Sequence, residues 1–161
     1  MMVFSLEELF VWGKNDKGQL GLGHKLYQDK PTPLESLTVP FYQTAVGSEH
    51  SLILMGDSNL YGCGDNRYGQ LGIIIDSTCQ LSPTKINGIH GEIIKIACGG
   101  SHSMALLRDG TLYSWGKNDV GQLGVGHTQN LHLPTQVTAL NHQIIQIECG
   151  NNFSVALTKE G

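Results

Sequence analysis

Short runs of apolar, β-branched and aromatic residues recur along the chain, and turn residues separate them. One stretch contains three such runs: IIKIACG (93–99), SMALL (103–107) and TLYSWG (111–116). Runs of this length and composition are typical of β-strands. Arg108-Asp109-Gly110 lies between the last two runs and is a turn signal of the kind that closes hairpins. The pattern predicts antiparallel strands, and the absence of a 3.6-residue period disfavours helical repeats.

A fourth extended segment follows these runs, and a proline lies near its start. The segment reads PTPLESL from Pro31, LSPTKI from Leu81 and LPTQV from Leu133. Proline lacks an amide donor and therefore suits the first residue of a strand, or an edge strand. Each unit of the chain is thus predicted to hold four short strands.

Two phrases return with a period of about 51 residues, which indicates an internal repeat. GQLG occurs at 18–21, 69–72 and 121–124, and a second phrase occurs as AVGSEHSLIL (45–54), ACGGSHSMAL (97–106) and ECGNNFSVAL (148–157). One four-stranded sheet cannot bury both of its faces, so such units must stack on one another. We therefore expect an all-β fold, a β-propeller of four-stranded antiparallel blades. The chain, residues 1–161, is expected to be one domain with repeats at about 9–59, 60–110 and 111–161.

The GQLG phrase is predicted to build a corner of a blade. In WGKNDKGQLG, Trp12 is expected to end a strand in the core, and Asn15 can hydrogen-bond its own backbone in a turn. Gly18 and Gly21 permit a positive φ, and Gln19 can satisfy backbone groups that the loop leaves open. The phrase therefore needs no ligand to explain it.

The combined phrases WGxNxxGQLGxG, xxCGxxHSxAL and DGxLYxWG resemble the regulator of chromosome condensation repeat family. The likeness extends from about Leu9 to Gly161. It implies a seven-bladed β-propeller, of which this chain holds three repeats.

Composition narrows the classes of function. Glycine supplies 21 of the 161 residues, which fits many tight turns. The net charge is −4 and the ten basic residues are scattered, so nucleic acid is a poor partner. No apolar stretch approaches the ~20 residues that span a membrane. We expect a cytoplasmic or nuclear protein.

The four cysteines do not indicate a metal site. Cys98 and Cys149 lie one repeat apart, Cys63 replaces the tryptophan of the other copies, and Cys79 lies in a variable loop. Without a closely spaced pair, small thiols in a reducing compartment are the better interpretation. We predict no metal and no cofactor.

His50-Ser51 and His102-Ser103 resemble halves of a nucleophile pair. Adjacent residues of a strand point to opposite faces, however, and the third copy has Phe153 in place of the histidine. We interpret both pairs as framework and predict no catalytic residue.

Candidate binding residues are sought where the copies differ, because loops on a rigid scaffold are free to vary. Ile73, Ile74, Ile75 and Asp76 replace the LGH and VGH of the other copies and are a candidate partner surface. The alternative is that the isoleucines extend a strand or fill a gap. A second candidate surface is the segment 41–42, Phe41 and Tyr42, with the same alternative.

The boundaries of the repeats predict an incomplete ring. The start, Leu9 to Gly13, matches the last strand of a repeat, and the end at Gly161 matches the turn before that strand. Three periods thus supply two whole blades and one blade split between the termini, whereas closure takes at least ~4 blades. A fragment of a longer protein is the favoured explanation. A homodimer that completes a ring of six blades and a ring completed by another protein stay open.

The expected function is a protein–protein interaction module that presents variable loops. The alternative implied by the resemblance is guanine nucleotide exchange on a Ran-like small GTPase, which needs no covalent chemistry. No exchange residue can be assigned to a numbered position. A further alternative is a segment of a larger HECT-type ubiquitin ligase, with catalysis outside these residues.

Overall fold

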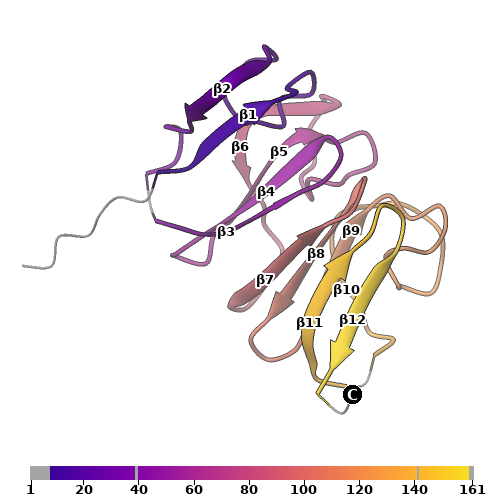
Figure 1. The fold of residues 1–161 in the computed structure, drawn as a ribbon. Coiled ribbons are helices and arrows are strands. Elements are labelled where there is room, and N and C mark those ends of the chain that lie inside the picture. Colours follow the sequence, from indigo (N-terminus) through magenta and orange to yellow (C-terminus); the bar gives the residue numbers. More distant parts are fainter. Residues whose placement is uncertain (1–7, 39, 141, 160–161) are drawn as a thin grey trace, which may run out of the picture.

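The computed structural model describes residues 8–38, 40–140 and 142–159, and all regular elements of these ranges are β-strands. Twelve strands form four antiparallel sheets that follow one another along the chain (Figure 1). The strands are β1 (Phe10–Gly13), β2 (Gln28–Pro33), β3 (Phe41–Val46), β4 (His50–Met55), β5 (Leu60–Asp65), β6 (Cys79–Lys85), β7 (Ile93–Cys98), β8 (His102–Leu107), β9 (Leu112–Gly116), β10 (Leu131–Gln136), β11 (Ile144–Cys149) and β12 (Ser154–Thr158). The predicted all-β class and four-stranded antiparallel units are confirmed.

Two of the sheets are complete blades and two are halves. The strand orders β3-β4-β5-β6 and β7-β8-β9-β10 define the first and second blade. The β1–β2 pair precedes them and the β11–β12 pair follows them, each as a two-stranded sheet. By position in the repeat, β1–β2 matches the outer strands of a blade and β11–β12 matches the inner strands. In Figure 1 these half-blades lie at opposite ends of the row.

The outer strands differ from their predicted boundaries. The strand expected to start at Pro31 begins at Gln28 and ends at Pro33. Pro83 and Pro134 likewise lie inside β6 and β10 instead of at their starts. Each of these strands is the outer edge of its sheet, where one side of the backbone has no pairing strand. A proline is tolerated there because no ladder hydrogen bond is lost.

Apolar side chains fill the space between successive sheets. The largest cluster includes Leu52 and Leu71 of the first blade and Ile96 and Trp115 of the second. A second cluster joins the second blade to β11, where Ile147 is fully buried. The cluster between β1–β2 and the first blade has only three buried members, Leu34, Ile53 and Met55. The joint next to this half-blade is therefore the least covered of the three.

Trp12 and Trp115 occupy the same position of the repeat but have opposite environments. Trp115 is fully buried, and its Nε1 donates a hydrogen bond of 3.0 Å to the carbonyl of Gln70. Trp12 is 61% exposed. The prediction that Trp12 lies in the core was wrong: Trp115 is covered by the preceding sheet, and the described residues include no sheet that precedes β1–β2.

Histidine and serine form a repeated contact across the joints. His50 Nε2 lies 2.9 Å from Ser103 Oγ, and Ser103 Oγ donates to the carbonyl of Gln70 at 2.7 Å. Because that bond uses the only hydroxyl hydrogen, Nε2 is the donor to Ser103. His102 repeats the arrangement with Ser154, at 2.9 Å. Each histidine thus meets the serine of the next repeat and not its neighbour in sequence.

Both histidines are neutral at physiological pH. Burial lowers the pKa of His50 from 6.5 to about 3, and it lowers the pKa of His102 to about 4. In the unfolded chain each imidazole takes up a proton below about pH 6.5. In the folded protein the two imidazoles take up a proton only at a far lower pH. Lowering the pH therefore favours unfolding.

We predict that lowering the pH from about 7.5 to about 5.5 reduces the free energy of unfolding by about 2 to 3 kcal/mol, from the two histidines together. Urea unfolding at both pH values measures this. The control variant carries His50→Phe and His102→Phe, since Phe153 occupies this position in the third repeat. Its stability should change far less over this range. An equal change in the variant would show that other groups cause the effect.

Candidate functional site

The connection between the two outer strands of each repeat is held by one buried asparagine. In the first blade, Asn66 Oδ1 accepts a hydrogen bond of 3.0 Å from the backbone N–H of Leu71. Its Nδ2 donates to the carbonyl of Ile73 at 3.1 Å. Asn15 and Asn118 are also buried and repeat these contacts in their own loops. The loop backbone is thereby fixed without any ligand.

A glutamine and two glycines complete each loop. Gln19 Oε1 accepts the backbone N–H of Lys17 at 2.9 Å, as predicted. Gly18 and Gly21 have φ values of +83° and +73°, which confirms the expected left-handed conformation. In the second copy, a Cβ on Gly69 would lie 2.4 Å from Cα of His132, on β10 of the next blade. The loop therefore packs tightly on its neighbour.

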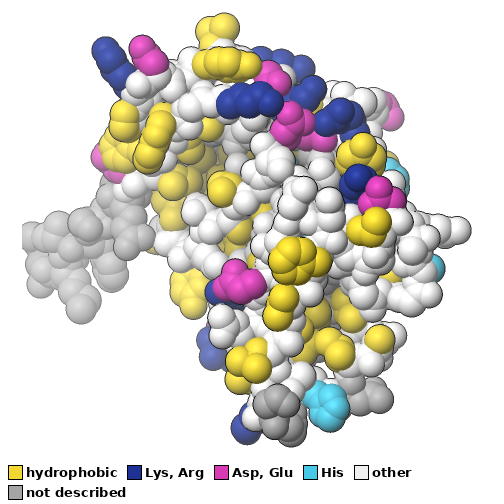
Figure 2. All heavy atoms as spheres, turned by 45° about the vertical axis from the view of Figure 1, so that its right-hand side comes forward, with side chains coloured by type: hydrophobic (Ala, Val, Ile, Leu, Met, Phe, Trp, Pro, Cys, Tyr) yellow, Lys and Arg dark blue, Asp and Glu magenta, His cyan; other side chains and the backbone are white. Residues whose placement is uncertain are grey.

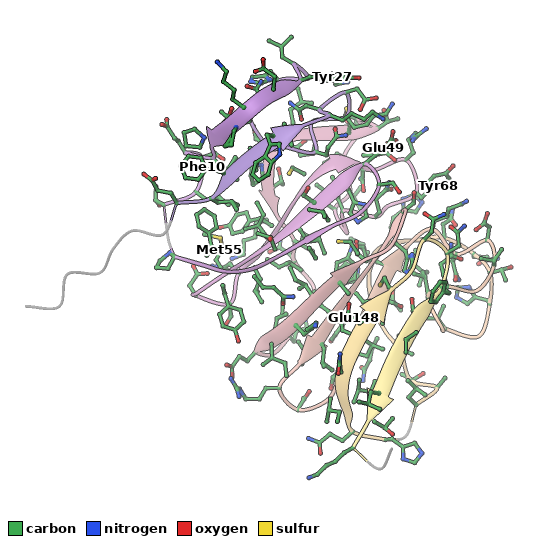
Figure 3. The ribbon with its side chains drawn as sticks, viewed as in Figure 1. Phe10, Tyr27, Glu49, Met55, Tyr68 and Glu148 are labelled. Carbon is green, nitrogen blue, oxygen red and sulfur yellow. The ribbon has the colours of Figure 1, made fainter. Side chains whose placement is uncertain are left out.

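Charged side chains and one tyrosine in and beside the loops form a surface, which we call the loop face. It consists of Lys14, Asp16, Glu49, Asp65, Arg67, Tyr68, Lys117 and Asp119. Figure 2 shows basic and acidic side chains gathered along the upper rim of the molecule. In Figure 3, Glu49 and Tyr68 lie at this end of the sheets and Met55 lies at the other end.

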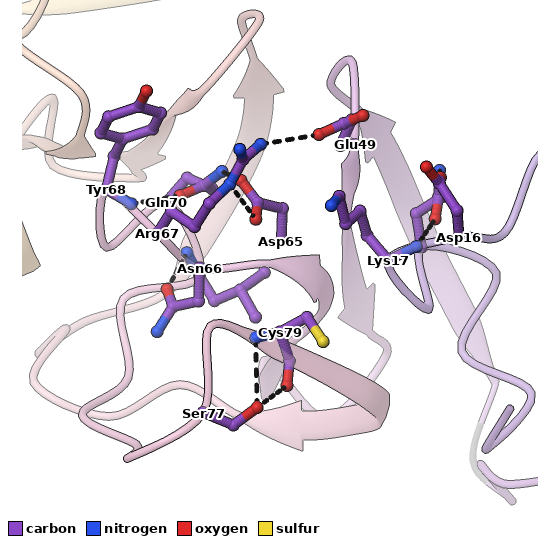
Figure 4. A network of polar contacts seen from close by, with 12 residues as sticks. Asp16, Lys17, Glu49, Asp65, Asn66, Arg67, Tyr68, Gln70, Ser77 and Cys79 are labelled. Atoms are coloured by element: carbon purple, nitrogen blue, oxygen red, sulfur yellow. Dashed lines mark hydrogen bonds and ion pairs between the residues drawn. The ribbon is translucent and has the colours of Figure 1, made fainter. Parts of the chain in front are cut away.

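Glu49 connects two loops that belong to different sheets. It accepts hydrogen bonds of 2.9 Å from Lys14 Nζ and from Arg67 Nη2. Arg67 Nε also donates to Asp65 at 2.8 Å (Figure 4). The bond to Asp65 raises the pKa of the Arg67 guanidinium, and the bond to Glu49 raises the pKa of Lys14. All four charges are thus held in fixed positions.

Tyr68 lies between two cations at the joint between the blades. The charged groups of Arg67 and Lys117 lie 5.9 Å and 5.3 Å from the centre of its ring. Exposed ion pairs and cation–π contacts each contribute only about 0.5 to 1 kcal/mol. Asp65 is the exception, because it is buried and depends on Arg67 and Gln70 for its hydrogen bonds. The fold therefore does not require most of the loop face.

The four candidate residues after the GQLG loop have different environments. Ile73 is only 8% exposed and belongs to the main core cluster, and Ile75 packs against the same cluster. These two isoleucines fill a gap, as the alternative expected. Ile74 is 77% exposed and Asp76 is exposed beside it. Ile74 and Asp76 are therefore the members of this set that a partner could contact.

Phe41 and Tyr42 lie at the other end of the first blade. Phe41 pairs with Met55, whereas the loop face follows Asp65, near His50. Phe41 is half-buried against the third cluster and Tyr42 is 63% exposed. The two candidate surfaces are thus at opposite ends of one sheet, and a single small contact cannot include both.

Ser103 and Cys63 are not activated as nucleophiles. The Ser103 hydroxyl donates its hydrogen to a carbonyl, so its oxygen is not activated by the histidine. All four cysteines are free thiols. Burial raises the pKa of Cys63 to about 12, so its thiol stays protonated. In the described ranges, no cluster of His, Cys, Asp or Glu side chains could hold a metal ion.

The charged cluster was not predicted from the sequence, although a signal was present. Lys14, Asp65 and Lys117 occupy one repeat position, and Asp16, Arg67 and Asp119 occupy another. The second copy therefore reverses both signs relative to the other two. That reversal places Arg67 beside Glu49 of the same blade, whose carboxylate also binds Lys14 across the joint.

The three repeats match a known family. A model of the regulator of chromosome condensation (RCC1) repeat matches residues 7–54, 57–106 and 109–157, which is most of the chain. The chain belongs to the RCC1 repeat family. A second model of the RCC1 repeat matches residues 41–70 and 93–122. The predicted resemblance is confirmed.

Similar RCC1-repeat proteins are much longer than this chain. E3 ubiquitin-protein ligase HERC2 of Mus musculus is 37% identical over 159 residues, which cover 96% of this chain and 3% of HERC2. Ultraviolet-B receptor UVR8 of Arabidopsis thaliana is 36% identical over 159 residues, 96% of this chain and 36% of UVR8. Prp20p of Saccharomyces cerevisiae, whose crystal structure was studied with its binding to Gsp1p and histones, has a TM-score of 0.85 at 31% identity. That match covers 95% of this chain and 41% of Prp20p.

We predict that Asn118→Ala lowers the free energy of unfolding by about 1 to 3 kcal/mol, because it leaves buried backbone groups unpaired. Asn118 makes side-chain hydrogen bonds to Leu123, His127 and Gln129. Urea unfolding measures the loss. The exposed Asn87 supplies the control, and Asn87→Ala should change stability by less than about 0.5 kcal/mol. Equal effects of both substitutions would contradict the role of Asn118.

Proposed function

We propose that these RCC1 repeats act as a protein-interaction module whose binding surface is the loop face together with Ile74 and Asp76. One observation supports this most strongly. The loop framework of asparagine, glutamine and glycine is the same in three copies, whereas the exposed side chains above it differ from copy to copy. A fixed backbone with variable side chains is what recognition of one particular partner requires.

The chemistry of the loop face suits a protein partner. Tyrosine and arginine are enriched among the residues that dominate binding energies at interfaces. Tyr68 lies against Arg67, and the hydrogen bonds of Arg67 to Asp65 and Glu49 hold the guanidinium in place. Because these side chains are already held in place, little conformational entropy is lost when a partner binds. Both signs of charge are present, so the partner is expected to carry both as well.

The longer relatives suggest how such a module is used. HERC2 is an E3 ubiquitin-protein ligase, and the chain matches 3% of its length. We propose that a segment like this one recruits a protein while the transfer chemistry takes place elsewhere in a larger protein. The protonated Cys63 thiol and the neutral histidines support a recruiting role rather than a catalytic one. With its free thiols, the protein is expected in the cytoplasm or the nucleus.

Three tyrosines test the location of the surface. The immobilised chain captures its partner from a lysate, and the affinity for that partner is then measured with purified protein. Tyr68→Ala should weaken binding about tenfold or more, because an aromatic contact at the centre of an interface is lost. Tyr27→Ala, at an exposed tyrosine that is not one of the loop-face residues, should weaken binding far less. Loss of binding in Tyr42→Ala alone would move the site to Phe41 and Tyr42.

Guanine nucleotide exchange is the second candidate. It is supported by the TM-score of 0.85 to Prp20p, which was studied with its binding to Gsp1p. Exchange requires only a surface that binds the nucleotide-free GTPase more tightly than the nucleotide-bound form. Release of labelled GDP from a Ran-like GTPase tests it directly. Acceleration by the chain that Tyr68→Ala reduces would establish exchange at the loop face, and unchanged release at micromolar protein would contradict it.

A further inference from the structure

One exposed segment links the two whole blades. Residues 86–92 carry the chain from β6, the last strand of the first blade, to β7 of the second blade (Figure 1). Ile86 is buried in the main core cluster, and Ile89 packs against the same cluster. Asn87 and Gly88 lie exposed between these two apolar anchors. The segment is thus fixed at two points, and its polar part stands out into solvent.

The exposed part has the sequence Asn-Gly, which occurs nowhere else in the chain. Asparagine is one of the thermally labile residues of proteins. The backbone nitrogen of the following residue can attack its side-chain carbon Cγ, and a glycine at that place leaves the nitrogen unshielded because it has no Cβ. Residues 87–88 therefore combine a reactive amide with an accessible nucleophile.

The surroundings of this pair leave both groups free to react. A Cβ built on Gly88 would have no atom within 4 Å. In the part of the chain that the structure describes, no hydrogen bond holds the side chain of Asn87 or the N–H of Gly88. Residues 86–90 also lie outside the strands. The rotation that brings the nitrogen to Cγ therefore breaks no hydrogen bond.

The asparagines of the three loops are protected in comparison. Asn15, Asn66 and Asn118 are buried, and the side-chain oxygen of each accepts a backbone N–H. None of the three is followed by glycine. Their amides are thus held in place, whereas the amide of Asn87 is not.

An Asp-Gly pair in a hairpin provides a second comparison, because aspartate can undergo the same ring closure. The N–H of Gly110 donates to the carbonyl of Leu107 at 3.0 Å. The side chain of Asp109 accepts the N–H of Thr111 at 2.9 Å. Both reacting groups are occupied there, so we expect this pair to stay intact.

We propose that Asn87 deamidates spontaneously to isoaspartate and that this change loosens the joint between the two whole blades. The backbone nitrogen of Gly88 bonds to Cγ of Asn87 and closes a succinimide ring. The side-chain nitrogen leaves as ammonia, with the proton that the Gly88 nitrogen gives up. Water then opens the ring. Cleavage of the bond to Cγ gives aspartate, and cleavage of the bond to the backbone carbonyl carbon gives isoaspartate.

Isoaspartate lengthens the main chain by one atom, because the chain then runs through Cβ and Cγ. The anchor on one side has little room to move. Ile86 donates its N–H to the carbonyl of Leu60 at 2.8 Å, and its Cγ2 lies 3.2 Å from where a Cβ on Gly72 would be. The extra atom is therefore expected to displace Ile89, the less buried anchor, and to uncover part of the core cluster between the blades.

Mass spectrometry of the aged chain tests the modification. The full chain is kept in neutral buffer at physiological temperature for several weeks and then digested with trypsin. Cleavage after Lys85 and Lys95 releases residues 86–95, INGIHGEIIK, in which Asn87 is the only asparagine. We expect this peptide to show the mass of the acid, with fragments that distinguish isoaspartate from aspartate. The peptides that contain Asn66 and Asn118 should keep their amides.

The synthetic peptide INGIHGEIIK shows whether the fold permits the reaction. Because the pair is not held in the folded chain, its rate of deamidation there should lie within about tenfold of the rate in the peptide. Asn87→Gln, which keeps an amide but would have to close a larger ring, should stay unmodified in the chain. An intact Asn87 after ageing, or a far slower reaction in the chain than in the peptide, would overturn the proposal.

Urea unfolding tests the effect on the joint. The acidic fraction of the aged chain is separated by ion exchange and compared with fresh Asn87→Asp, which has the same added charge but a main chain of normal length. The aged fraction should unfold at a urea concentration lower by about 0.5 M or more, and Asn87→Asp should unfold like the fresh chain. Asn87→Gln aged in the same way controls for changes elsewhere. Equal midpoints for the aged fraction and Asn87→Asp would contradict a loosened joint.

Discussion

Each sheet of this protein has two apolar faces, and only a neighbouring sheet can cover them. The second blade meets this requirement on both sides, with the first blade against one face and β11–β12 against the other. Trp115 and Leu106 are fully buried as a result. The β1–β2 half-blade meets it on one side only, and its tryptophan is largely exposed. Equivalent residues of the repeats, such as Trp12 and Trp115, thus differ in burial because their sheets are covered by neighbouring sheets to different degrees.

The polar framework follows the same repeat and separates structure from recognition. One asparagine fixes each loop, and the serine and histidine contacts cross the joints and hold successive sheets together. The side chains of these residues have hydrogen-bond partners in the protein, apart from Nδ1 of the two histidines. What is left for binding is the layer above them, where Arg67 and Tyr68 of one connection meet Glu49 of another at one surface. The charge pattern of that layer differs between copies because the fold does not depend on it.

Much of the fold could be predicted from the sequence because the relevant signals are local and repeated. Strand composition, turn residues and the two phrases that recur with one period predict four-stranded units and the split blade.

The environment of a single residue was harder to predict. Trp12 was placed in the core because its phrase is nearly identical to that of Trp115, yet burial depends on a neighbouring sheet that the described residues do not include. Ile73, Ile74 and Ile75 are identical in type, and only the path of the backbone separates the two that pack from the one that is exposed. The loop face depends on contacts between repeats, which a linear pattern does not show.

The account's central claim is that cover by neighbouring sheets determines the stability of each sheet. Hydrogen exchange on the chain at micromolar concentration tests it most directly. Amides of β4 and β8 should exchange slowest, at rates that approach those of global unfolding, while amides of β1, β2 and β12 exchange orders of magnitude faster. Equal protection in all four sheets would contradict the claim, because the half-blades would then be as stable alone as the blades that are covered on both faces.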